Sequence, residues 1–527
     1  MAEQAGHSPP TRLHADRVRA GQPRRGRPHP GSGGGRPARG RADPARRAAY
    51  DVLRAVADRD AYANLLLPAV LAERGLTGRD AAFATELTYG TLRGRGTYDA
   101  ILAACSDRDK LDPPVRDVLR LGAHQLLATR VGQHAAVATS VDLAKDVCGP
   151  RPSGFVNAVL RRVATRDLDA WLAVIAPDPA QDPSGYLAVR YSYPRWIVEA
   201  FRDALGEAAA ETGDALAAGN TRPDVTLAVT PGLAGPVGLA TPEPPGTTRT
   251  RWSPYGLRLA SGDPAPLVAT GQITVQDEAS QLAALALARV SLTPAEGIPG
   301  IPAEGAPGTP AEGAPGATDR LWLDLCAGPG GKARLMAGLA AERGARLLAS
   351  DLRPHRAARV LDSLRHARLA PATSASPGLT GAVIATDGLR VPWKPGTFDR
   401  VLADVPCSNL GSLRRRAEAR WRKTPAGVQE LTALQRGLLN AAIDSVRPGG
   451  VVAYVTCSPH AAETRDIVTA VAASRDDVTI LDAPAVLPEI PGLQGPDPRF
   501  AQFWPHRHGT DAIFLALLKR AAHDRAR

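Results

Sequence analysis

The chain has 527 residues, enough for two or three domains, and a formal charge of +11 that suits a polyanionic partner. Its five cysteines include no CxxC pair and its histidines show no paired ligand pattern, so neither a disulfide framework nor a metal site is predicted. No apolar run could span a membrane, and the first residues lack the apolar stretch of a signal peptide. We expect a monomeric cytoplasmic protein without a membrane partner.

The first third of the chain divides by composition. Residues 1–45 are rich in Gly, Pro and Arg, and their very low apolar content predicts a disordered basic tail. Residues 46–170 carry apolar side chains at helical spacing throughout, and Asp112 before Pro113 is typical of a helix start. We therefore predict an all-helical domain over residues 46–170.

Three further regions follow. The alternating stretch Val225–Val229 after helical patterns predicts a small α+β domain over residues 185–290. Residues 291–319 repeat Pro, Ala, Glu and Gly with a period of eight and no apolar face, which predicts a disordered insertion. Strand and helix patterns then alternate over residues 320–520, as in a Rossmann-like, doubly wound α/β sheet.

The segment Leu321–Lys332 opens this last region with a short apolar strand and a glycine-rich turn. Glycines let the backbone approach a ligand closely, and the helix predicted to follow offers free N–H groups at its start. Asp351 ends the next strand, where an acid can accept hydrogen bonds from ribose hydroxyls. This order favours a nucleotide-like cofactor, while the alternative is an ordinary strand–turn–helix unit.

Two cysteines lie just past predicted strand ends, where doubly wound sheets bind their ligands. Cys407 and Cys457 each follow an apolar strand, and Asp387 and Asp404 lie at the same predicted edge. A thiolate is a strong nucleophile, although a lone cysteine is usually an inert buried residue. Because both cysteines are expected beside the cofactor turn, we predict a catalytic pair.

Motifs in both halves of the chain resemble known families. Those that resemble S-adenosylmethionine-dependent RNA cytosine-5 methyltransferases are Cys326–Lys332 (Cys-Ala-Gly-Pro-Gly-Gly-Lys), Asp404–Ser408 (Asp-Val-Pro-Cys-Ser) and Thr456–Ser458 (Thr-Cys-Ser). Residues 83–94 and 154–163 resemble the NusB-like RNA-binding domain. With both parts present, the chain is similar to the RsmB-type (Sun/Fmu) 16S ribosomal RNA methyltransferases from about residue 46 to residue 518.

The resemblance implies methyl transfer from S-adenosylmethionine to carbon 5 of a cytosine in 16S ribosomal RNA, through a covalent cysteine–cytosine intermediate. It assigns attack on carbon 6 to Cys457, help in release of the enzyme to Cys407, and contact with base and cofactor to Asp404. Asp351 would meet the ribose and Asp387 the adenine. The cofactor-binding residues that it implies are Cys326, Ala327, Gly328, Pro329, Gly330, Gly331, Lys332, Asp351, Asp387 and Asp404. Lys332 would lie near the methionine carboxylate or Asp404, or else be a solvated lysine.

Basic residues interleaved with one aromatic residue follow Cys407, a composition that suits single-stranded RNA with a base turned out of its stack. The predicted RNA-binding residues are Arg414, Arg415, Arg420 and Trp421. A charge run is more often a solvated surface, but this one adjoins the predicted site.

Three other functions stay open. Transfer RNA could be the substrate of the same reaction. A non-catalytic RNA-binding factor for ribosome assembly or antitermination needs the helical domain but not the cysteine pair. A dinucleotide-dependent oxidoreductase shares the turn and the acid, yet it gives no reason for two cysteines at strand ends.

Overall fold

The computed structural model describes residues 42–108, 110–232, 243–292, 319–368 and 381–522. The predicted basic tail and repeat insertion therefore lie almost entirely outside the described residues. One boundary needs correction, because the first helix already begins at Pro44, inside the segment predicted as tail.

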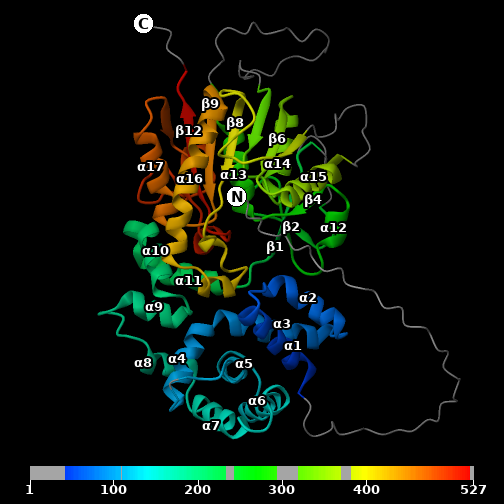
Figure 1. Ribbon diagram of the computed structural model, residues 1–527, viewed down its shortest axis with the longest axis vertical. Helices are drawn as coiled ribbons and strands as arrows, with labels where there is room; N and C mark the ends of the chain where they lie inside the picture. Colours follow the sequence, from blue (N-terminus) through cyan, green and yellow to red (C-terminus); the bar gives the residue numbers. More distant parts are fainter. Residues whose placement is uncertain (1–41, 109, 233–242, 293–318, 369–380, 523–527) are drawn as a thin grey trace, which may run out of the picture. The chain divides into compact units, whose positions relative to one another are not determined.

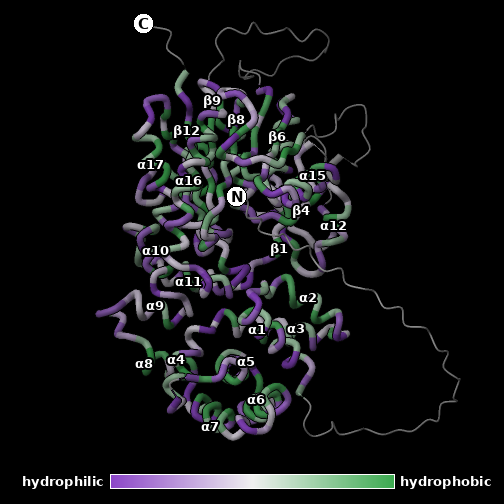
Figure 2. The backbone as a smooth tube through the Cα atoms, in the orientation of Figure 1, coloured by the Kyte–Doolittle hydropathy of each residue, from purple (hydrophilic) through white to green (hydrophobic). Residues whose placement is uncertain are grey.

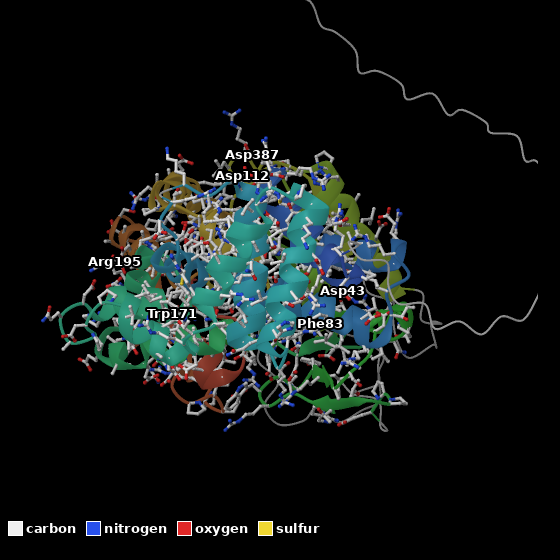
Figure 3. The ribbon with its side chains drawn as sticks, turned by 90° about the horizontal axis from the view of Figure 1, so that it is seen from below. Asp43, Phe83, Asp112, Trp171, Arg195 and Asp387 are labelled. Atoms are coloured by element: carbon white, nitrogen blue, oxygen red, sulfur yellow. The ribbon has the colours of Figure 1, made fainter. Side chains whose placement is uncertain are left out.

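The first described region is helical (blue to cyan in Figure 1). Its helices are α1 (Pro44–Asp58), α2 (Ala63–Glu73), α3 (Gly78–Arg93), α4 (Arg95–Cys105), α5 (Pro113–Ala128), α6 (Gln133–Cys148), α7 (Ser153–Val163) and α8 (Leu168–Ile175). Asp43 begins α1 by accepting a hydrogen bond from the backbone N–H of Arg46 at 3.0 Å. Helix α5 begins at Pro113 as predicted, although the Asp112 side chain, labelled with Asp43 in Figure 3, makes no capping hydrogen bond. Amphipathic patterns along these helices (Figure 2) bury Leu53 and Leu87 in one shared core.

The second region joins helices to a small antiparallel sheet. Its elements are α9 (Pro183–Tyr191), α10 (Arg195–Leu205), η1 (Gly206–Glu211), α11 (Thr212–Asn220), β1 (Val225–Val229), β2 (Thr247–Arg249), β3 (Gly256–Leu259), α12 (Ala265–Ala269), β4 (Ile273–Val275) and α13 (Glu278–Arg289). The strand order is β2-β3-β1-β4, with antiparallel pairing throughout. The predicted strand Val225–Val229 is a central strand of this sheet.

The third region is the large sheet. Its elements are β5 (Leu321–Asp324), α14 (Gly331–Ala341), β6 (Arg346–Asp351), α15 (Pro354–Arg368), β7 (Gly381–Ala385), β8 (Phe398–Asp404), η2 (Leu410–Ser412), η3 (Ala417–Trp421), α16 (Pro425–Ser445), β9 (Val446–Thr456), η4 (Ala461–Glu463), α17 (Arg465–Ala473), β10 (Val478–Leu481), η5 (Pro484–Val486), β11 (Ala501–Gln502), α18 (Pro505–His508) and β12 (Phe514–Arg520). The strand order is β10-β12-β9-β8-β5-β6-β7, and β11 pairs with β12. Strands β7, β6, β5, β8 and β9 are parallel, whereas β12 is antiparallel to β9. The order reverses between β5 and β8, where such sheets bind ligands.

Helices cover both faces of this sheet because successive strand residues point to opposite sides. Trp322 of β5 packs into a core shared with α13, α14 and α15. Its neighbour Leu323 packs into a second core shared with α16 and α17. This layering confirms the Rossmann-like α/β fold. The helices cover the two faces of the sheet, so the carboxyl ends of the parallel strands are the place where a ligand can bind.

Strand β12 begins at Phe514, and the N–H of Ala512, two residues earlier, donates to the carbonyl of Gly411 outside the sheet. Among the described residues, no helix is both long and apolar enough to cross a bilayer.

Candidate active site

The glycine-rich turn lies between β5 and α14, at the point where the strand order reverses. Gly330 precedes α14 with a φ of +115°, a conformation that other residues rarely adopt. A Cβ atom on Gly328 would lie 2.4 Å from Oδ2 of Asp351, and the Gly328 N–H donates to that same oxygen at 3.1 Å. The turn therefore needs glycine to pass close to the tip of β6, as a ligand cradle requires.

A buried carboxyl group lies beneath this turn. Asp324, the last residue of β5, is 1% exposed, and neither of its carboxyl oxygens accepts a hydrogen bond of good geometry. Burial, with the nearby charge of Asp404, raises the pKa of Asp324 to about 8. Sequence reasoning missed this residue, and the available signal was an acid at the end of an otherwise apolar strand. A buried polar group without a partner marks a place where a ligand can supply one.

Lys332 pairs with Asp404 across the switch point. The Lys332 Nζ atom lies 2.9 Å from Oδ2 of Asp404, which ends β8. Burial alone would lower the pKa of Lys332, but Asp404 beside it more than offsets this and raises the pKa above its usual value. Of the alternatives for Lys332, the structure therefore shows the pair with Asp404.

The two predicted cysteines meet at the same edge. The Sγ atoms of Cys407 and Cys457 are 3.3 Å apart, and Oδ1 of Asn409 lies 2.7 Å from Sγ of Cys457. Cys407 is 8% exposed, while Cys457 is the more accessible of the two. The hydrogen bond with Cys457, together with burial, raises the pKa of the Cys407 thiol. This arrangement holds one thiol protonated directly beside a second, more accessible one.

The remaining predicted cofactor residues border the same edge. Ala327, Pro329 and Gly331 complete the turn, and Asp387 follows β7, where it accepts a hydrogen bond from the N–H of Leu389 at 2.9 Å (labelled in Figure 3). Burial and the neighbouring acids raise the pKa of the Cys326 thiol. Cys326 is therefore a poor nucleophile, which leaves the chemistry of the edge to the other two cysteines.

The basic segment after Cys407 differs from its prediction. We call residues Leu413–Lys423 the basic loop. Arg414 is paired with Asp277 at 3.0 Å and with Asp511 at 2.5 Å, and Arg415 is 2.8 Å from each of the same two carboxylates. Both carboxylate side chains are only 7% exposed. Burial and the proximity of Asp511 raise the pKa of Asp277, and the two arginines counteract this.

Arg420 and Trp421 are also engaged inside the protein. The Arg420 side chain is fully buried, with its guanidinium carbon 3.7 Å from the ring centroid of Tyr193 and a hydrogen bond to the carbonyl of Ser192 at 3.0 Å. Trp421 packs so closely on α4 that a Cβ atom on Gly96 would lie 2.5 Å from the indole. The assignment of Arg414, Arg415 and Arg420 to RNA contact is therefore corrected, because Arg414 and Arg415 are paired with carboxylates and Arg420 is completely buried against Tyr193.

The basic loop instead connects the large sheet to the helical region. Arg422 donates to the carbonyl of Val56 at the end of α1 at 2.8 Å. The buried carboxylate of Glu418 accepts a hydrogen bond from the N–H of Ala63 at the start of α2, at 3.1 Å. Ala417 lies in the helical core itself. The loop thus acts as a structural connector.

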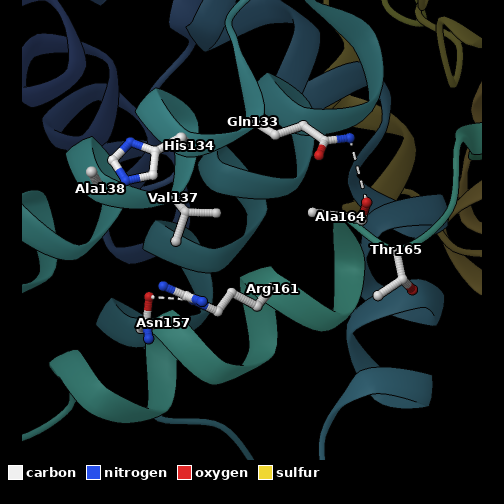
Figure 4. Close-up of a pocket in the computed structure, with 8 residues that line it drawn as sticks. All are labelled: Gln133, His134, Val137, Ala138, Asn157, Arg161, Ala164 and Thr165. Carbon is white, nitrogen blue, oxygen red and sulfur yellow. Dashed lines mark hydrogen bonds between the residues drawn. The ribbon is translucent and has the colours of Figure 1, made fainter.

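A separate hollow of about 400 Å³ lies between α6 and α7 (Figure 4). Its lining residues are Gln133, His134, Val137, Ala138, Asn157, Arg161, Ala164 and Thr165. Arg161 donates to Asn157 at 3.2 Å within it. None of the predicted catalytic residues borders it. In the described part of the chain, no three His, Cys, Asp or Glu side chains are arranged to hold a metal ion.

Comparison with known proteins gives matches over most of the chain. Residues 314–519 match the family 16S rRNA methyltransferase RsmB/F, and residues 43–165 match the NusB family. A putative methyltransferase of Mycobacterium tuberculosis (strain H37Rv) is 49% identical over 486 residues, which cover 91% of this chain and 97% of that protein. A probable ribosomal RNA small subunit methyltransferase B of Synechocystis is 31% identical over 490 residues, covering 90% and 99%. The crystal structure of PH0851 shares the fold, with a TM-score of 0.66, 21% identity, and coverage of 90% and 98%.

Proposed function

The chain belongs to the RsmB/F family of S-adenosylmethionine-dependent methyltransferases, and from this premise we propose that it methylates carbon 5 of a cytosine in 16S ribosomal RNA. The names of its relatives support ribosomal RNA as the substrate, and the NusB match supports an RNA partner. The observation that carries the proposed chemistry is the contact between Cys407 and Cys457 at 3.3 Å, at the edge that holds the cofactor turn. Work on ribosomal RNA would place the enzyme in the cytoplasm.

The residues at this edge fit the cofactor. When bound, S-adenosylmethionine supplies an electrophilic methyl group on a positively charged sulfur. The turn at Gly328–Gly331 lets the backbone approach a ligand, and the start of α14 offers N–H groups. Asp324 and Asp351 are buried acids at two adjacent strand tips, so they supply acceptors for an amino group and for ribose hydroxyls. We assign the adenine to the neighbourhood of Asp387.

The more accessible thiol, Cys457, is the nucleophile in this proposal. Its thiolate forms a bond to carbon 6 of the cytosine, which breaks the aromaticity and makes carbon 5 nucleophilic. After carbon 5 is methylated, its proton leaves, the double bond between carbons 5 and 6 re-forms, and the electron pair of the carbon–sulfur bond returns to Cys457. Cys407 contacts Cys457 directly, so it is placed to assist the release.

Asp404 and Lys332 orient the base. The ammonium of Lys332 fixes the carboxylate of Asp404 at 2.9 Å, on the strand next to the one that leads to Cys457. A fixed carboxylate can accept a hydrogen bond from the cytosine amino group, which would hold carbon 6 toward the thiol. In this assignment Lys332 holds the carboxylate of Asp404 in position, which a solvated lysine would not do.

The proposal is tested with the full-length protein, methyl-labelled S-adenosylmethionine and protein-free 16S ribosomal RNA. Digestion of the RNA to nucleosides should place the label in 5-methylcytidine. Label found only in transfer RNA would correct the substrate and keep the chemistry. A protein that binds RNA but labels none of it would contradict the proposal in favour of the non-catalytic factor.

A further inference from the structure

A buried carboxylate joins the two loops that carry the cysteines. Glu463, at the end of η4, is completely buried. Its Oε1 atom accepts hydrogen bonds from the backbone N–H of Ser408 at 2.7 Å and from Nε2 of Gln435 at 3.1 Å. Its Oε2 atom accepts from the hydroxyls of Ser408 and, at 2.7 Å, Ser458. Four donors therefore converge on one side chain.

The donors lie directly beside the cysteines in sequence. Ser408 follows Cys407 and Ser458 follows Cys457, and their two hydroxyls are 3.1 Å apart. Gln435 of α16 extends the network by donating to the carbonyl of Pro406, the residue before Cys407, at 2.9 Å. Each cysteine thus has a neighbour whose position depends on the same carboxylate.

Further hydrogen bonds join the two loops, since the Gly411 N–H donates to the carbonyl of Cys457 at 2.9 Å and Oδ1 of Asn409 lies 2.7 Å from Sγ of Cys457. Glu463 differs from these contacts because its carboxylate binds the residues that directly follow both cysteines. The loops leave β8 and β9 separately, and a bare contact between two thiols is weak. A carboxylate is the side chain that accepts four hydrogen bonds in one plane, and hydrogen bonds to a charged acceptor are the stronger kind. Tyr454 in turn fixes the segment by donating its hydroxyl to the carbonyl of Glu463 at 2.8 Å.

We propose that Glu463 is a positioning residue, which holds Cys407 and Cys457 at contact distance so that both can act on one base. The inference rests on the proposed function and extends it to a residue that touches neither substrate nor cofactor. It also gives Glu463 an electrostatic role. The hydrogen bond with Cys457 and burial raise the pKa of Cys407 most, and the negative charge of Glu463 raises it further.

The geometric part is tested with phenylarsine oxide, which binds two adjacent thiols and releases water. The wild-type protein should bind one arsenic through Cys407 and Cys457, and Cys407→Ala should abolish this binding. Glu463→Gln turns an NH₂ group toward the serine donors and should weaken the binding about tenfold, because the effective concentration of the second thiol falls. This measurement needs neither RNA nor cofactor, so it separates failure of the inference from failure of the proposed function.

The electrostatic part is tested by alkylation. The rate of iodoacetamide labelling at Cys407 is followed on its peptide by mass spectrometry as the pH is raised. The pH at which labelling accelerates should be lower in Glu463→Gln than in the wild type. On RNA, the same variant should lower kcat about 100-fold with little change in KM, as expected for displaced reacting groups. A purely structural role would not shift the alkylation profile.

Glu278→Gln is the matched control. Glu278 is also a buried carboxylate, and it accepts hydrogen bonds from the N–H groups of Trp252 and Ser253 at 2.6 and 2.8 Å. That variant should keep wild-type arsenic binding and alkylation. If Glu463→Gln does not fold, Ser458→Ala, which removes one donor but keeps the carboxylate charge, should weaken arsenic binding by a smaller factor and leave the alkylation profile unshifted. Wild-type arsenic binding in either Glu463→Gln or Ser458→Ala, or an unshifted alkylation profile in Glu463→Gln, would overturn the proposal.

Discussion

The sheet edge at Cys407 and the basic loop that follows it are neighbours in sequence, yet they differ in how far their polar groups are paired with other protein groups. At the edge, neither carboxyl oxygen of the buried Asp324 accepts a hydrogen bond of good geometry, and the thiol of Cys457 is partly accessible. In the basic loop, Arg414 is surrounded by two buried carboxylates and Arg420 is stacked on a tyrosine. The groups at the edge can still bind a ligand, whereas the two arginines of the basic loop are engaged inside the protein and stabilise the fold.

The buried aspartates Asp277 and Asp324 differ in the same way, although both are carboxylic acids. Asp277 is paired with Arg414 and Arg415, while neither oxygen of Asp324 accepts a hydrogen bond of good geometry. Both have a raised pKa because burial disfavours their charge. Of these two aspartates, Asp324 is the one at which a ligand can supply a partner. Burial alone therefore does not distinguish a functional acid from a structural one.

The largest effect is expected from Cys457→Ala, which removes the proposed nucleophile from the edge. Methyl transfer to RNA should fall by about 10⁴-fold or more. The free energy of unfolding should change by less than about 1 kcal/mol, because the thiol is partly exposed. Labelled methyl transfer and urea unfolding measure the two quantities. Cys148→Ala, at the end of α6, is the control and should keep full activity. Comparable activity in both variants would contradict a catalytic role for Cys457.

The next largest effect is expected in the basic loop. Arg414→Ala leaves Asp277 and Asp511 buried with one guanidinium fewer, and should lower the free energy of unfolding by about 3–5 kcal/mol. The exposed Arg436 of α16 offers a control, since Arg436→Ala should change it by less than about 0.5 kcal/mol. Chemical unfolding checks both. Unchanged stability together with weakened RNA binding in Arg414→Ala would restore the RNA-contact role.

The smallest effect concerns the pH dependence of stability. The folded protein keeps the proton of Asp324 up to a pH of about 8, whereas the unfolded chain loses it near pH 4. Between these values unfolding releases that proton, so stability falls by about 1.4 kcal/mol for each unit of rising pH through this group. Asp324→Asn should remove this contribution and flatten the curve, as measured by urea unfolding from pH 5 to pH 7. The exposed Asp169 gives the control Asp169→Asn, and equal slopes in both variants would contradict the account.

The sequence was sufficient for those parts of the molecule that local pattern determines. The cofactor turn, the strand ends at Asp351 and Asp404, and the start of α5 at Pro113 follow from short-range signals of polarity, glycine and proline. The contact between Cys407 and Cys457 was predictable because parallel strands end at a common edge.

Contacts between residues that lie far apart in the sequence could not be predicted from local patterns. Arg414 lies 137 residues from Asp277 and 97 from Asp511, so no local pattern distinguishes this buried cluster from a solvated RNA-binding run. The same holds for Glu463, whose donors come from two loops and a helix. A charged residue reveals its role only when the fold shows which groups surround it.

The central claim is that Cys457 forms the covalent bond to the base and Cys407 serves its release. The most direct test mixes the Cys407→Ala variant with S-adenosylmethionine and protein-free 16S ribosomal RNA, and examines the products on a denaturing gel. The account predicts a protein–RNA adduct that survives denaturation and disappears in Cys407→Ala/Cys457→Ala. An adduct that persists in the double variant, or none with any RNA, would contradict the claim.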